Sequence, residues 1–398
     1  MKKVTLVALA FPRRDLSPAL VSLAEFARQD PGLRTGFEFS LRQFLYRDNM
    51  ESVSAELLSE PGDVYGFSCY VWNVQECLQV AKLIKENNPR AVVLFGGPEA
   101  SGLAELLLQK YHFVDYVIKG EGEEPLQKFL LHLSGNLNID KVPALVYRNN
   151  NGEVLQNPRN KLLDFASLPS HYTNNEYLNY LNKVKEPVTV SFETARGCPF
   201  SCRYCAWGSR QVRFRPVPQV LSDLGKMLKH PSVARIYITD SDIFMNKQRG
   251  KTILNFLLEN NHRKLPVIFE VYPELLDEET TKLVARFDED EFAFGLQSSA
   301  PEVLESINRR FNPERYKRNI LKLKSANPDL RMWFSLIIGL PGDCLNTFKE
   351  SLAFAVSMAP YSLYVHEFLC LPGSEFFNTQ EQYGFLCQTE APHKLVYH

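Results

Sequence analysis

Three cysteines in one short stretch are the residues of this sequence best suited to do chemistry. Cys198, Cys202 and Cys205 follow the spacing C-x3-C-x2-C, and the nearest histidines, His171 and His230, lie more than 20 residues away. A structural zinc ion takes four protein ligands, and a ferredoxin-type [4Fe–4S] cluster also takes four. Three thiolates would leave one iron of such a cluster open for a ligand from outside the protein. We therefore favour an iron–sulfur site, with a zinc site, three structural cysteines in a turn and a plain electron-transfer cluster as alternatives.

The stretch from Arg196 to Cys205 resembles the signature of radical S-adenosylmethionine (SAM) enzymes. The resemblance implies that the three cysteines hold a [4Fe–4S] cluster and that the open iron binds the amino and carboxylate groups of SAM. It further implies that an electron from the cluster cleaves SAM to a 5′-deoxyadenosyl radical. Tyr204, directly before the last cysteine, also fits the family pattern, in which this aromatic lies beside the adenine.

Length and composition suit an ordinary globular enzyme. The chain has 398 residues, of which 45% are hydrophobic, so two or three domains with substantial cores are expected. The net charge of −1 predicts no nucleic-acid partner, and no apolar run is long enough for a membrane span. The apolar start is expected to be a first strand rather than a signal peptide. Eight cysteines, three of them clustered, indicate a reducing cytoplasmic location rather than a disulfide framework.

Residues 1–140 alternate apolar strand-like runs with amphipathic helical stretches. This alternation predicts a Rossmann-like parallel sheet with helices on both faces, and a strand order like that of flavodoxin fits it best. Ligands of such sheets bind at the carboxyl ends of the strands. The loops expected after the third, fourth and fifth strands carry the candidate ligand-binding residues Tyr70, Trp72, Asn73, Gly96, Gly97, Glu121 and Gly122.

A sheet with these loops, placed ahead of a radical SAM motif, resembles the B12-binding domain of cobalamin-dependent radical SAM enzymes. The resemblance extends over essentially the whole chain and implies that cobalamin binds at this edge, with Tyr70 or Trp72 below the cobalt. The sequence has no Asp-x-His-x-x-Gly motif and no histidine before His112, so we expect no histidine ligand to cobalt. A vestigial domain that serves only as a scaffold is the alternative.

Residues 141–187 are expected to form a connector that contains a hairpin, because an Asn-Gly turn separates two apolar runs there. From residue 188 the strand–helix alternation resumes with six expected strands. This pattern matches the partial (β/α)6 barrel of radical SAM enzymes, which we expect over residues 188–385, with a C-terminal tail at 386–398. The predicted fold class is therefore α/β, a flavodoxin-like sheet followed by a partial barrel.

Polar or glycine residues follow every expected barrel strand, at the end where such barrels place their active sites. Gln297, Ser298 and Glu270 could pair with the ribose hydroxyls of SAM, which need both donors and acceptors. Asp240 or Asp242 could meet the SAM ammonium or a ribose hydroxyl. Arg309 could bind the SAM carboxylate, and Gly339 could form a tight turn beside the adenine. Helix capping is the alternative role for the polar candidates.

The resemblance implies an enzyme that cleaves SAM with its cluster and uses cobalamin to methylate an unactivated carbon of a small-molecule substrate. Radical rearrangement or ring closure without methyl transfer is one alternative. A cobalamin or iron–sulfur sensor without turnover is another. The resemblance also implies a reductant such as flavodoxin or ferredoxin as a partner, whereas the sequence does not identify the substrate.

Overall fold

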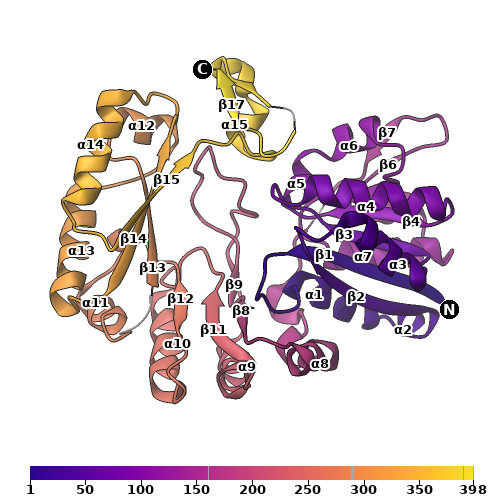
Figure 1. Cartoon of the computed structure of the whole chain (residues 1–398), viewed down its shortest axis with the longest axis horizontal. Helices are drawn as coiled ribbons and strands as arrows, with labels where there is room; N and C mark the ends of the chain where they lie inside the picture. The colour runs from indigo at the N-terminus through magenta and orange to yellow at the C-terminus, as the bar shows by residue number, and fades with distance from the viewer. Residues whose placement is uncertain (160, 288–290, 389, 398) are drawn as a thin grey trace. The chain divides into compact units, whose positions relative to one another are not determined.

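The computed structural model of the chain describes residues 1–159, 161–287, 291–388 and 390–397 (Figure 1). No helix among them is both long and apolar enough to cross a membrane. The chain divides into two compact units. The first unit is Met1–Leu181 with Leu371–Asn378 and Gln388–His393, and the second is Asn182–Cys370 with Thr379–Cys387 and Lys394–His398.

The first unit is built on a seven-stranded sheet with the order β2-β1-β3-β4-β5-β6-β7. Its first five strands are parallel and confirm the predicted flavodoxin order. The central strands are buried on both faces, as the continuous apolar runs of their sequences require. The five parallel strands are β1 (Lys2–Ala10), β2 (Phe37–Leu45), β3 (Val64–Ser68), β4 (Val92–Gly96) and β5 (Tyr116–Ile118).

Helices cover both faces of this sheet and enclose two hydrophobic cores (Figure 1). Successive residues of β1 enter opposite cores, because side chains of a strand alternate between its two faces. One core contains residues of α1 (Pro18–Arg28), α2 (Pro31–Gly36) and α7 (Glu123–Leu133). The other contains residues of α3 (Met50–Ser59), α4 (Val74–Asn87), α5 (Pro98–Gly102) and α6 (Ala104–Lys110).

The predicted hairpin is present, but it belongs to the first sheet rather than to a separate connector. Its strands, β6 (Leu145–Arg148) and β7 (Val154–Gln156), add antiparallel to β5. This pairing covers the edge that β5 would otherwise expose. η1 (Ile139–Lys141) comes before this hairpin, and η2 (Phe165–Ser167), η3 (His171–Thr173) and α8 (Asn175–Lys183) follow it. The boundary of the first unit falls at Leu181.

Six parallel strands of the second unit confirm the predicted partial barrel. Hydrogen-bond ladders join them as β12-β11-β8 and β13-β14-β15, and within the described residues β12 and β13 are in contact without a ladder. The strands are β8 (Val188–Phe192), β11 (Val233–Ile238), β12 (Val267–Phe269), β13 (Glu291–Gln297), β14 (Arg331–Ile338) and β15 (Ser362–Glu367). The intervening helices are α9 (Val217–Lys229), α10 (Lys247–Asn260), η4 (Pro273–Leu275), α11 (Glu278–Val284), α12 (Pro301–Ser306), α13 (Pro313–Ala326) and α14 (Leu345–Val356).

Side chains of the barrel strands alternate between two environments. Phe192, Ile238 and Phe294 are fully buried, whereas their neighbours Ser191 and Tyr237 are only half-buried. The fully buried set packs under the helices, so the half-buried set lies on the inner face of the barrel. This half-buried set mixes small or polar residues such as Ser191 and Ala293 with the larger Tyr237, Ile268 and Trp333.

The predicted C-terminal tail, residues 386–398, is not a single free segment. β16 (Leu386–Cys387) and β17 (Leu395–Tyr397) form an antiparallel ladder in the second unit, whereas Gln388–His393 packs in the first. Residues 389 and 398 of this stretch lie outside the described residues. Before it, α15 (Glu375–Asn378) also packs in the first unit and η5 (Gln380–Tyr383) in the second.

Candidate functional site

The three cysteines lie in the loop between β9 (Ala195–Arg196) and β10 (Arg213–Phe214), beyond the carboxyl end of β8. β9 and β10 pair antiparallel and close the base of the loop. Gly197 has a φ of +105°, and a Cβ there would lie 2.4 Å from the carbonyl oxygen of Gln211. Only glycine fits this close approach, so the residue before the first cysteine is dictated by the loop geometry.

Backbone hydrogen bonds fold the cysteine loop back on itself. The Cys198 amide donates to the Ser209 oxygen at 2.9 Å, and the Cys205 amide donates to the Cys202 oxygen at 3.1 Å. Cys198 and Cys202 are half-buried and Cys205 is exposed, so none of the three is a core residue. Within the described residues, no three His, Cys, Asp or Glu side chains already form a group that could hold a metal ion. The thiols are thus gathered in one turn but are not preset around a metal.

The protein alone does not favour the thiolate of Cys205. Desolvation of its sulfur raises the pKa of Cys205 to about 11, and the Trp207 amide, which donates to that sulfur, offsets only part of the rise. Metals bind thiolates rather than thiols. Any metal in this loop must therefore supply the positive charge that stabilises the deprotonated sulfur.

The cysteine loop is clamped to the connection between α12 and α13. The Arg203 amide donates to the Ile307 oxygen at 3.0 Å, and its guanidinium donates to the Ser306 oxygen at 2.8 Å. Asn308 donates through Nδ2 to the Ser201 oxygen at 3.0 Å. These contacts hold the middle of the loop, between its first and last cysteine.

Arg309 is buried next to this clamp and is engaged by protein groups. Its Nη1 lies 3.4 Å from the Tyr204 hydroxyl and 3.2 Å from the Tyr272 hydroxyl, and its Nη2 donates to the carbonyl oxygen of Gly295. Both terminal nitrogens therefore have protein partners, and the role of Arg309 as the partner of the SAM carboxylate stays a prediction. The structure likewise directs the Tyr204 hydroxyl to Arg309.

Asp240 holds the entry to the cysteine loop. Its Oδ1 accepts from the amides of Thr194 and Ala195 at 2.8 Å each, and its Oδ2 accepts from the Thr194 hydroxyl. Arg249 donates to the same hydroxyl at 2.7 Å. Burial raises the pKa of Asp240 to about 6, although these hydrogen bonds oppose the rise. Both oxygens of Asp240 accept hydrogen bonds from Thr194 or Ala195, so Asp240 positions the loop, and its contact with SAM stays a prediction.

Asp242 and Glu270 form an acidic pair at the ends of β11 and β12. Asp242 accepts from the amides of Phe244, at 2.6 Å, and Tyr272. Glu270 lies on the inner face and accepts from the Tyr237 hydroxyl at 3.4 Å. Desolvation raises the pKa of each carboxyl group to about 7. Glu270 retains unused hydrogen-bonding capacity, whereas both oxygens of Asp242 are used by backbone amides.

Gln297 and Ser298, which follow each other at the end of β13, have different roles. Gln297 has a φ of +61°, and its side-chain Oε1 is buried without a hydrogen-bond partner. The Ser298 hydroxyl pairs with Ser351 Oγ at 3.1 Å and accepts from the Ala300 amide at 3.2 Å. The Ser298 hydroxyl therefore has protein partners without capping α12, whose N-cap residue is Ala300, and Gln297 keeps a free acceptor at the barrel edge. Contact of either residue with SAM stays a prediction.

Gly339, at the end of β14, confirms the predicted tight turn. Its φ is +83°, and no atom lies within 4 Å of the position that a Cβ would take. The turn therefore leaves open space beside its backbone at the same barrel edge as Gln297.

In the first unit, aromatic side chains gather at the carboxyl ends of β1, β2 and β3. Tyr70 and Trp72 stack with ring centroids 4.4 Å apart and an interplanar angle of 12°. Phe11 joins them, with its ring 5.6 Å from Trp72 and 4.9 Å from Tyr46. Trp72 is 42% exposed and Phe11 is 41% exposed, so this cluster, which we call the aromatic platform, presents apolar surface to solvent.

Phe11 and Tyr46 of the aromatic platform were not among the predicted site residues. Each directly follows a strand, Phe11 after β1 and Tyr46 after β2. The rule that ligands bind at the carboxyl ends of parallel strands would have identified both residues.

Asn73, Gly97 and Gly122 make contacts within the first unit. Asn73 accepts from the Tyr70 amide at 2.7 Å and donates to the Leu9 oxygen at 3.0 Å. A Cβ on Gly97 would lie 2.5 Å from the Cys69 oxygen, and one on Gly122 would lie 2.9 Å from a methyl group of Leu23. Internal packing therefore requires glycine at position 97, and the part of all three residues in ligand binding stays a prediction.

Gly96 and Glu121 remain at the edge of the sheet. The nearest atom to a Cβ on Gly96 would be 4.0 Å away, so its backbone is approachable. Glu121 is half-buried, and its carbonyl oxygen accepts from Arg159. The neighbouring Glu123 is buried, and Ser22 donates to it at 2.9 Å.

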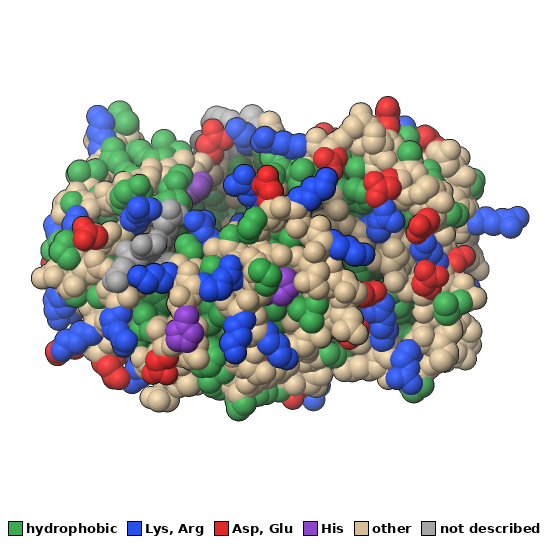
Figure 2. Space-filling model, turned by 60° about the horizontal axis from the view of Figure 1, so that its bottom comes forward, with side chains coloured by type: hydrophobic (Ala, Val, Ile, Leu, Met, Phe, Trp, Pro, Cys, Tyr) green, Lys and Arg blue, Asp and Glu red, His purple; other side chains and the backbone are tan. Residues whose placement is uncertain are grey.

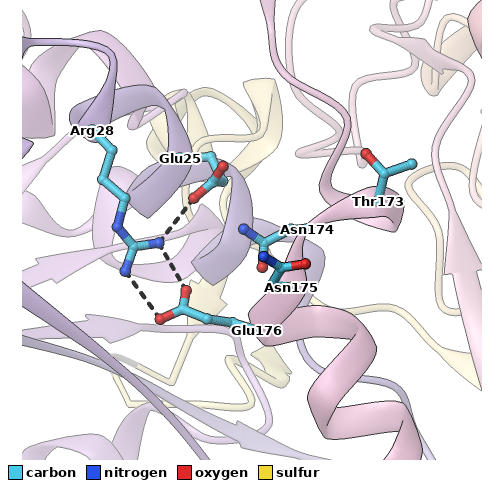
Figure 3. Close-up of a pocket in the computed structure, with 6 residues that line it drawn as sticks. All are labelled: Glu25, Arg28, Thr173, Asn174, Asn175 and Glu176. Atoms are coloured by element: carbon cyan, nitrogen blue, oxygen red, sulfur yellow. Dashed lines mark hydrogen bonds and ion pairs between the residues drawn. The ribbon is translucent and has the colours of Figure 1, made fainter.

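A polar pocket elsewhere in the first unit is explained by an ion pair. It is lined by residues of α1 and of the segment that begins α8 (Figure 3). Arg28 reaches Glu25 at 2.8 Å and binds both oxygens of Glu176, at 2.8 and 3.0 Å. This pocket joins two helices and lies away from the carboxyl ends of the strands.

Figure 2 shows Lys and Arg side chains scattered among Asp and Glu over the visible face, in keeping with the net charge of −1.

Two family models match the chain. The B12 binding domain matches residues 26–130, and the radical SAM superfamily matches residues 192–355. The first match falls in the first unit, with β2 to β5, and the second falls in the second unit, with the cysteine loop.

Curated relatives match the chain through both units. It is 25% identical over 375 residues to 2-(S-pantetheinyl)-carbapenam-3-carboxylate methyltransferase of Streptantibioticus cattleyicolor, covering 90% of this chain and 54% of that protein. It is 26% identical over 391 residues to the cobalamin-dependent radical SAM methyltransferase TokK of Streptomyces tokunonensis, covering 91% of this chain and 55% of that protein. The chain thus spans about half the length of these curated relatives.

A solved structure shares the architecture of both units. The radical SAM methyltransferase TsrM from Kitasatospora setae, with cobalamin and a [4Fe–4S] cluster bound, matches with a TM-score of 0.78 and 17% identity. The match covers 98% of this chain and 81% of that chain. It confirms the predicted α/β fold, a parallel sheet followed by a radical SAM barrel. By its two family matches, the chain belongs to the radical SAM superfamily, in the group whose members carry a B12-binding domain ahead of the radical SAM domain.

Proposed function

We propose that the chain is part of a cobalamin-dependent radical SAM enzyme that methylates an unactivated carbon of a small-molecule substrate. The observation that carries the proposal is the loop of three non-core cysteines at the carboxyl edge of a partial barrel, joined in one chain to a B12-binding domain. The names of the two curated relatives, both methyltransferases, support methyl transfer as the reaction.

Cys198, Cys202 and Cys205 would hold a [4Fe–4S] cluster. Their chemistry fits this group, because three thiols in one turn provide one ligand fewer than a closed site needs. When bound, the cluster supplies an electron to SAM and an open iron that SAM can chelate. The protein holds the loop in place through Asp240 and through the clamp that Arg203 makes with the α12–α13 connection.

Gln297 and Glu270 would bind the ribose of SAM at the open edge of the barrel. Gln297 offers a buried acceptor without a partner, and Glu270 offers a carboxyl group whose only described hydrogen bond is a long one to Tyr237. A ribose hydroxyl could donate a hydrogen bond to either of these acceptors. The open space beside Gly339 would admit the adenine. Asp242 and Ser298 would shape this edge without contacting SAM.

Cobalamin would rest on the aromatic platform of the first unit. A corrin is broad and largely apolar, and the exposed rings of Trp72 and Phe11 supply a matching surface. The approachable backbone of Gly96 would border the same edge, with Glu121 beside it. His393 is the histidine bonded to the β4–α5 region, but its two nitrogens are used by Glu99 and by the Gln388 oxygen. His393 is therefore not available to cobalt. Together with the missing Asp-x-His-x-x-Gly motif, this leads us to propose that no histidine binds cobalt.

The proposed enzyme needs a source of single electrons, for which flavodoxin or ferredoxin is the expected class of partner. A reducing cytoplasm would suit eight cysteines that are all free thiols. The substrate would be a small molecule, bound at the half-buried inner face of the barrel.

Products of SAM distinguish the proposal from its alternatives. The anaerobically reconstituted chain, given reductant, hydroxocobalamin and SAM, should form both 5′-deoxyadenosine and S-adenosylhomocysteine. Formation of S-adenosylhomocysteine should require the cobalamin. 5′-Deoxyadenosine alone would support rearrangement or ring closure instead, and neither product would support a sensor.

A further inference from the structure

We propose that Arg309 is a positioning residue whose buried positive charge favours the reduced state of the cluster in the cysteine loop. The inference rests on the proposed function, because it assumes that Cys198, Cys202 and Cys205 hold a [4Fe–4S] cluster. It assigns Arg309 a role that differs from contact with SAM.

The first step is that no described carboxylate pairs directly with Arg309. Its side chain is only 8% exposed. Among the residues that the structure describes, no carboxylate lies within ion-pair distance of its guanidinium, and its described partners are two tyrosine hydroxyls and a carbonyl oxygen. The half-buried Glu274 is near enough to interact with this charge but forms no ion pair with it. A buried cation without a directly paired counter-ion is costly, so a further anion nearby would stabilise it.

The second step is that the contacts of Arg309 direct this charge at the cysteine loop. Tyr204, whose hydroxyl lies 3.4 Å from Arg309 Nη1, stands between Cys202 and Cys205 in the sequence. The guanidinium also lies over the ring of Tyr272, 5.1 Å from its centroid, and this ring stacks on Phe200 of the loop at 4.5 Å. One aromatic residue of the loop, Tyr204, thus contacts Arg309 directly, and another, Phe200, packs on the ring of Tyr272 that Arg309 covers.

Three buried polar atoms without hydrogen-bond partners support a fixed position for the guanidinium. Arg309 Nε, Tyr316 Oη and Glu274 Oε2 are each buried without a hydrogen-bond partner. Two donors and one acceptor of this kind suit an ordered water molecule. Such a water would tie the guanidinium to Glu274, so the carboxylate would orient Arg309 without pairing with it directly.

The third step concerns the charge of the cluster. A cubane held by three thiolates is anionic, and one-electron reduction makes it more negative. Reduction potentials of iron–sulfur clusters depend on net charge, hydrogen bonds and solvent exposure. A nearby buried cation interacts more strongly with the more negative state, so Arg309 should raise the potential of the cluster.

The test compares two adjacent arginines that differ in burial. Arg309→Gln and Arg310→Gln remove the same charge, but Arg310 is exposed. The reconstituted unmodified chain and both variants should be titrated with redox mediators while the reduced cluster is followed by electron paramagnetic resonance. We expect a more negative midpoint potential for Arg309→Gln and an unchanged one for Arg310→Gln. Equal potentials in all three proteins would overturn the inference.

Two further variants separate charge from loop assembly. Arg309→Lys keeps the charge and should retain a potential close to that of the unmodified chain. Arg309→Met fills a similar space without charge, so it should make the midpoint potential of the cluster more negative. It serves as the uncharged variant if Arg309→Gln loses its cluster. Loss of iron and sulfide from both Met and Gln variants would contradict the inference and leave Arg309 as an assembly residue. Absence of a cluster from the unmodified chain would instead refute the proposed function.

Discussion

Among single residues, Gln297 combines two costs that a protein does not keep without a reason. Its φ of +61° places a non-glycine residue in the left-handed region, which costs roughly 1–3 kcal/mol. Its Oε1 is also buried and unpaired. The side chain lies over Gly295, where a Cβ would come within 2.9 Å of it. The absence of a side chain at position 295 is what makes this arrangement possible, and a ligand that donates to Oε1 would account for it.

We expect Gln297→Ala to weaken SAM binding by roughly 1–3 kcal/mol, the cost of one lost hydrogen bond to a polar ligand. Iron and sulfide content should be unchanged. The neighbouring Ser298→Ala is the control, because its hydroxyl is used by Ser351 and Ala300. It should lower the unfolding free energy rather than SAM affinity. Isothermal titration and denaturant unfolding check both effects, and equal SAM affinities for Gln297→Ala and the unmodified chain would remove Gln297 from the site.

The sequence reveals which residues stand at strand ends, but not which of them are already engaged. Strand-end position identifies Gln297, Glu270 and Trp72, whose side chains retain free capacity. It also selects Asp240, whose carboxylate already accepts hydrogen bonds from the amides of Thr194 and Ala195, 46 and 45 positions away in the chain. Arg309 could not be placed from sequence, because its partners come from the cysteine loop, β13 and the residue before η4. Long-range hydrogen bonds of this kind leave no local pattern.

Among the elements, β11 and β12 end in two carboxyl groups that make stability depend on pH. Desolvation raises the pKa of Glu270 from 4.5, and that of Asp242 from 3.8, to about 7. The folded chain therefore holds protons that the unfolded chain has already released. Because of these two carboxyl groups, the free energy of unfolding falls as the pH rises from about 4 through about 7.

Replacing one of these carboxyl groups should remove part of that dependence. We expect Glu270→Gln to raise the unfolding free energy of the metal-free chain by roughly 1–3 kcal/mol at about pH 8 and to change it little at about pH 4. Glu259→Gln, on the exposed side of α10, is the matched control and should have no such effect. Urea unfolding at the two pH values checks this, and a pH-independent effect of Glu270→Gln would contradict it.

A buried contact between His393 and Glu99 helps to hold the segment Gln388–His393 in the first unit. His393 is fully buried and bonded to Glu99, which is 3% exposed. Burial opposes the protonated form, but the bond to Glu99 outweighs it, and the pKa of His393 is raised above 6.5. The stabilisation is therefore fully present below about pH 6.5 and is lost as the pH rises through the raised pKa.

Breaking this contact should release the segment. His393→Ala should cost roughly 1–3 kcal/mol, because it leaves the Glu99 carboxyl buried and unpaired. Lys394→Ala removes only an exposed ion pair with Glu367 and should cost less than about 1 kcal/mol. Hydrogen exchange of the segment, measured at pH values on both sides of 6.5, distinguishes the two. Equal protection in both variants would show that the buried contact does not hold the segment.

Periodicity predicted the strands of both sheets but not every partner. Parallel order and helix coverage follow from the alternation of strand and helix patterns. The hairpin of β6 and β7 was predicted from its turn, yet its pairing with β5 depends on an edge that only the folded sheet defines. The return of Gln388–His393 to the first unit depends on a contact 294 positions apart, between His393 and Glu99. Neither feature is encoded in a local pattern.

For the whole molecule, each unit carries its proposed cofactor site on its own parallel strands. Because the units have separate sheets, loss of one site should leave the other unit folded. We expect Cys198→Ala, Cys202→Ala or Cys205→Ala to lose iron, sulfide and SAM cleavage while keeping cobalamin affinity. Cys344→Ser, at an exposed cysteine outside the loop, should lose neither. A triple alanine variant with full iron and sulfide content would contradict the assignment of the loop.

The reciprocal prediction concerns cobalamin. Trp72→Ala removes the exposed ring that stacks on Tyr70, so we expect at least tenfold weaker binding of hydroxocobalamin, about 1.4 kcal/mol, with the cluster intact. Trp207→Ala, at a similarly exposed tryptophan of the second unit, should leave this affinity unchanged. The bound cob(II)alamin should show no nitrogen superhyperfine splitting in its electron paramagnetic resonance spectrum, because both nitrogens of His393 are engaged. Nitrogen splitting would overturn the absence of an axial histidine, and failure of micromolar hydroxocobalamin to bind would overturn the cobalamin site itself.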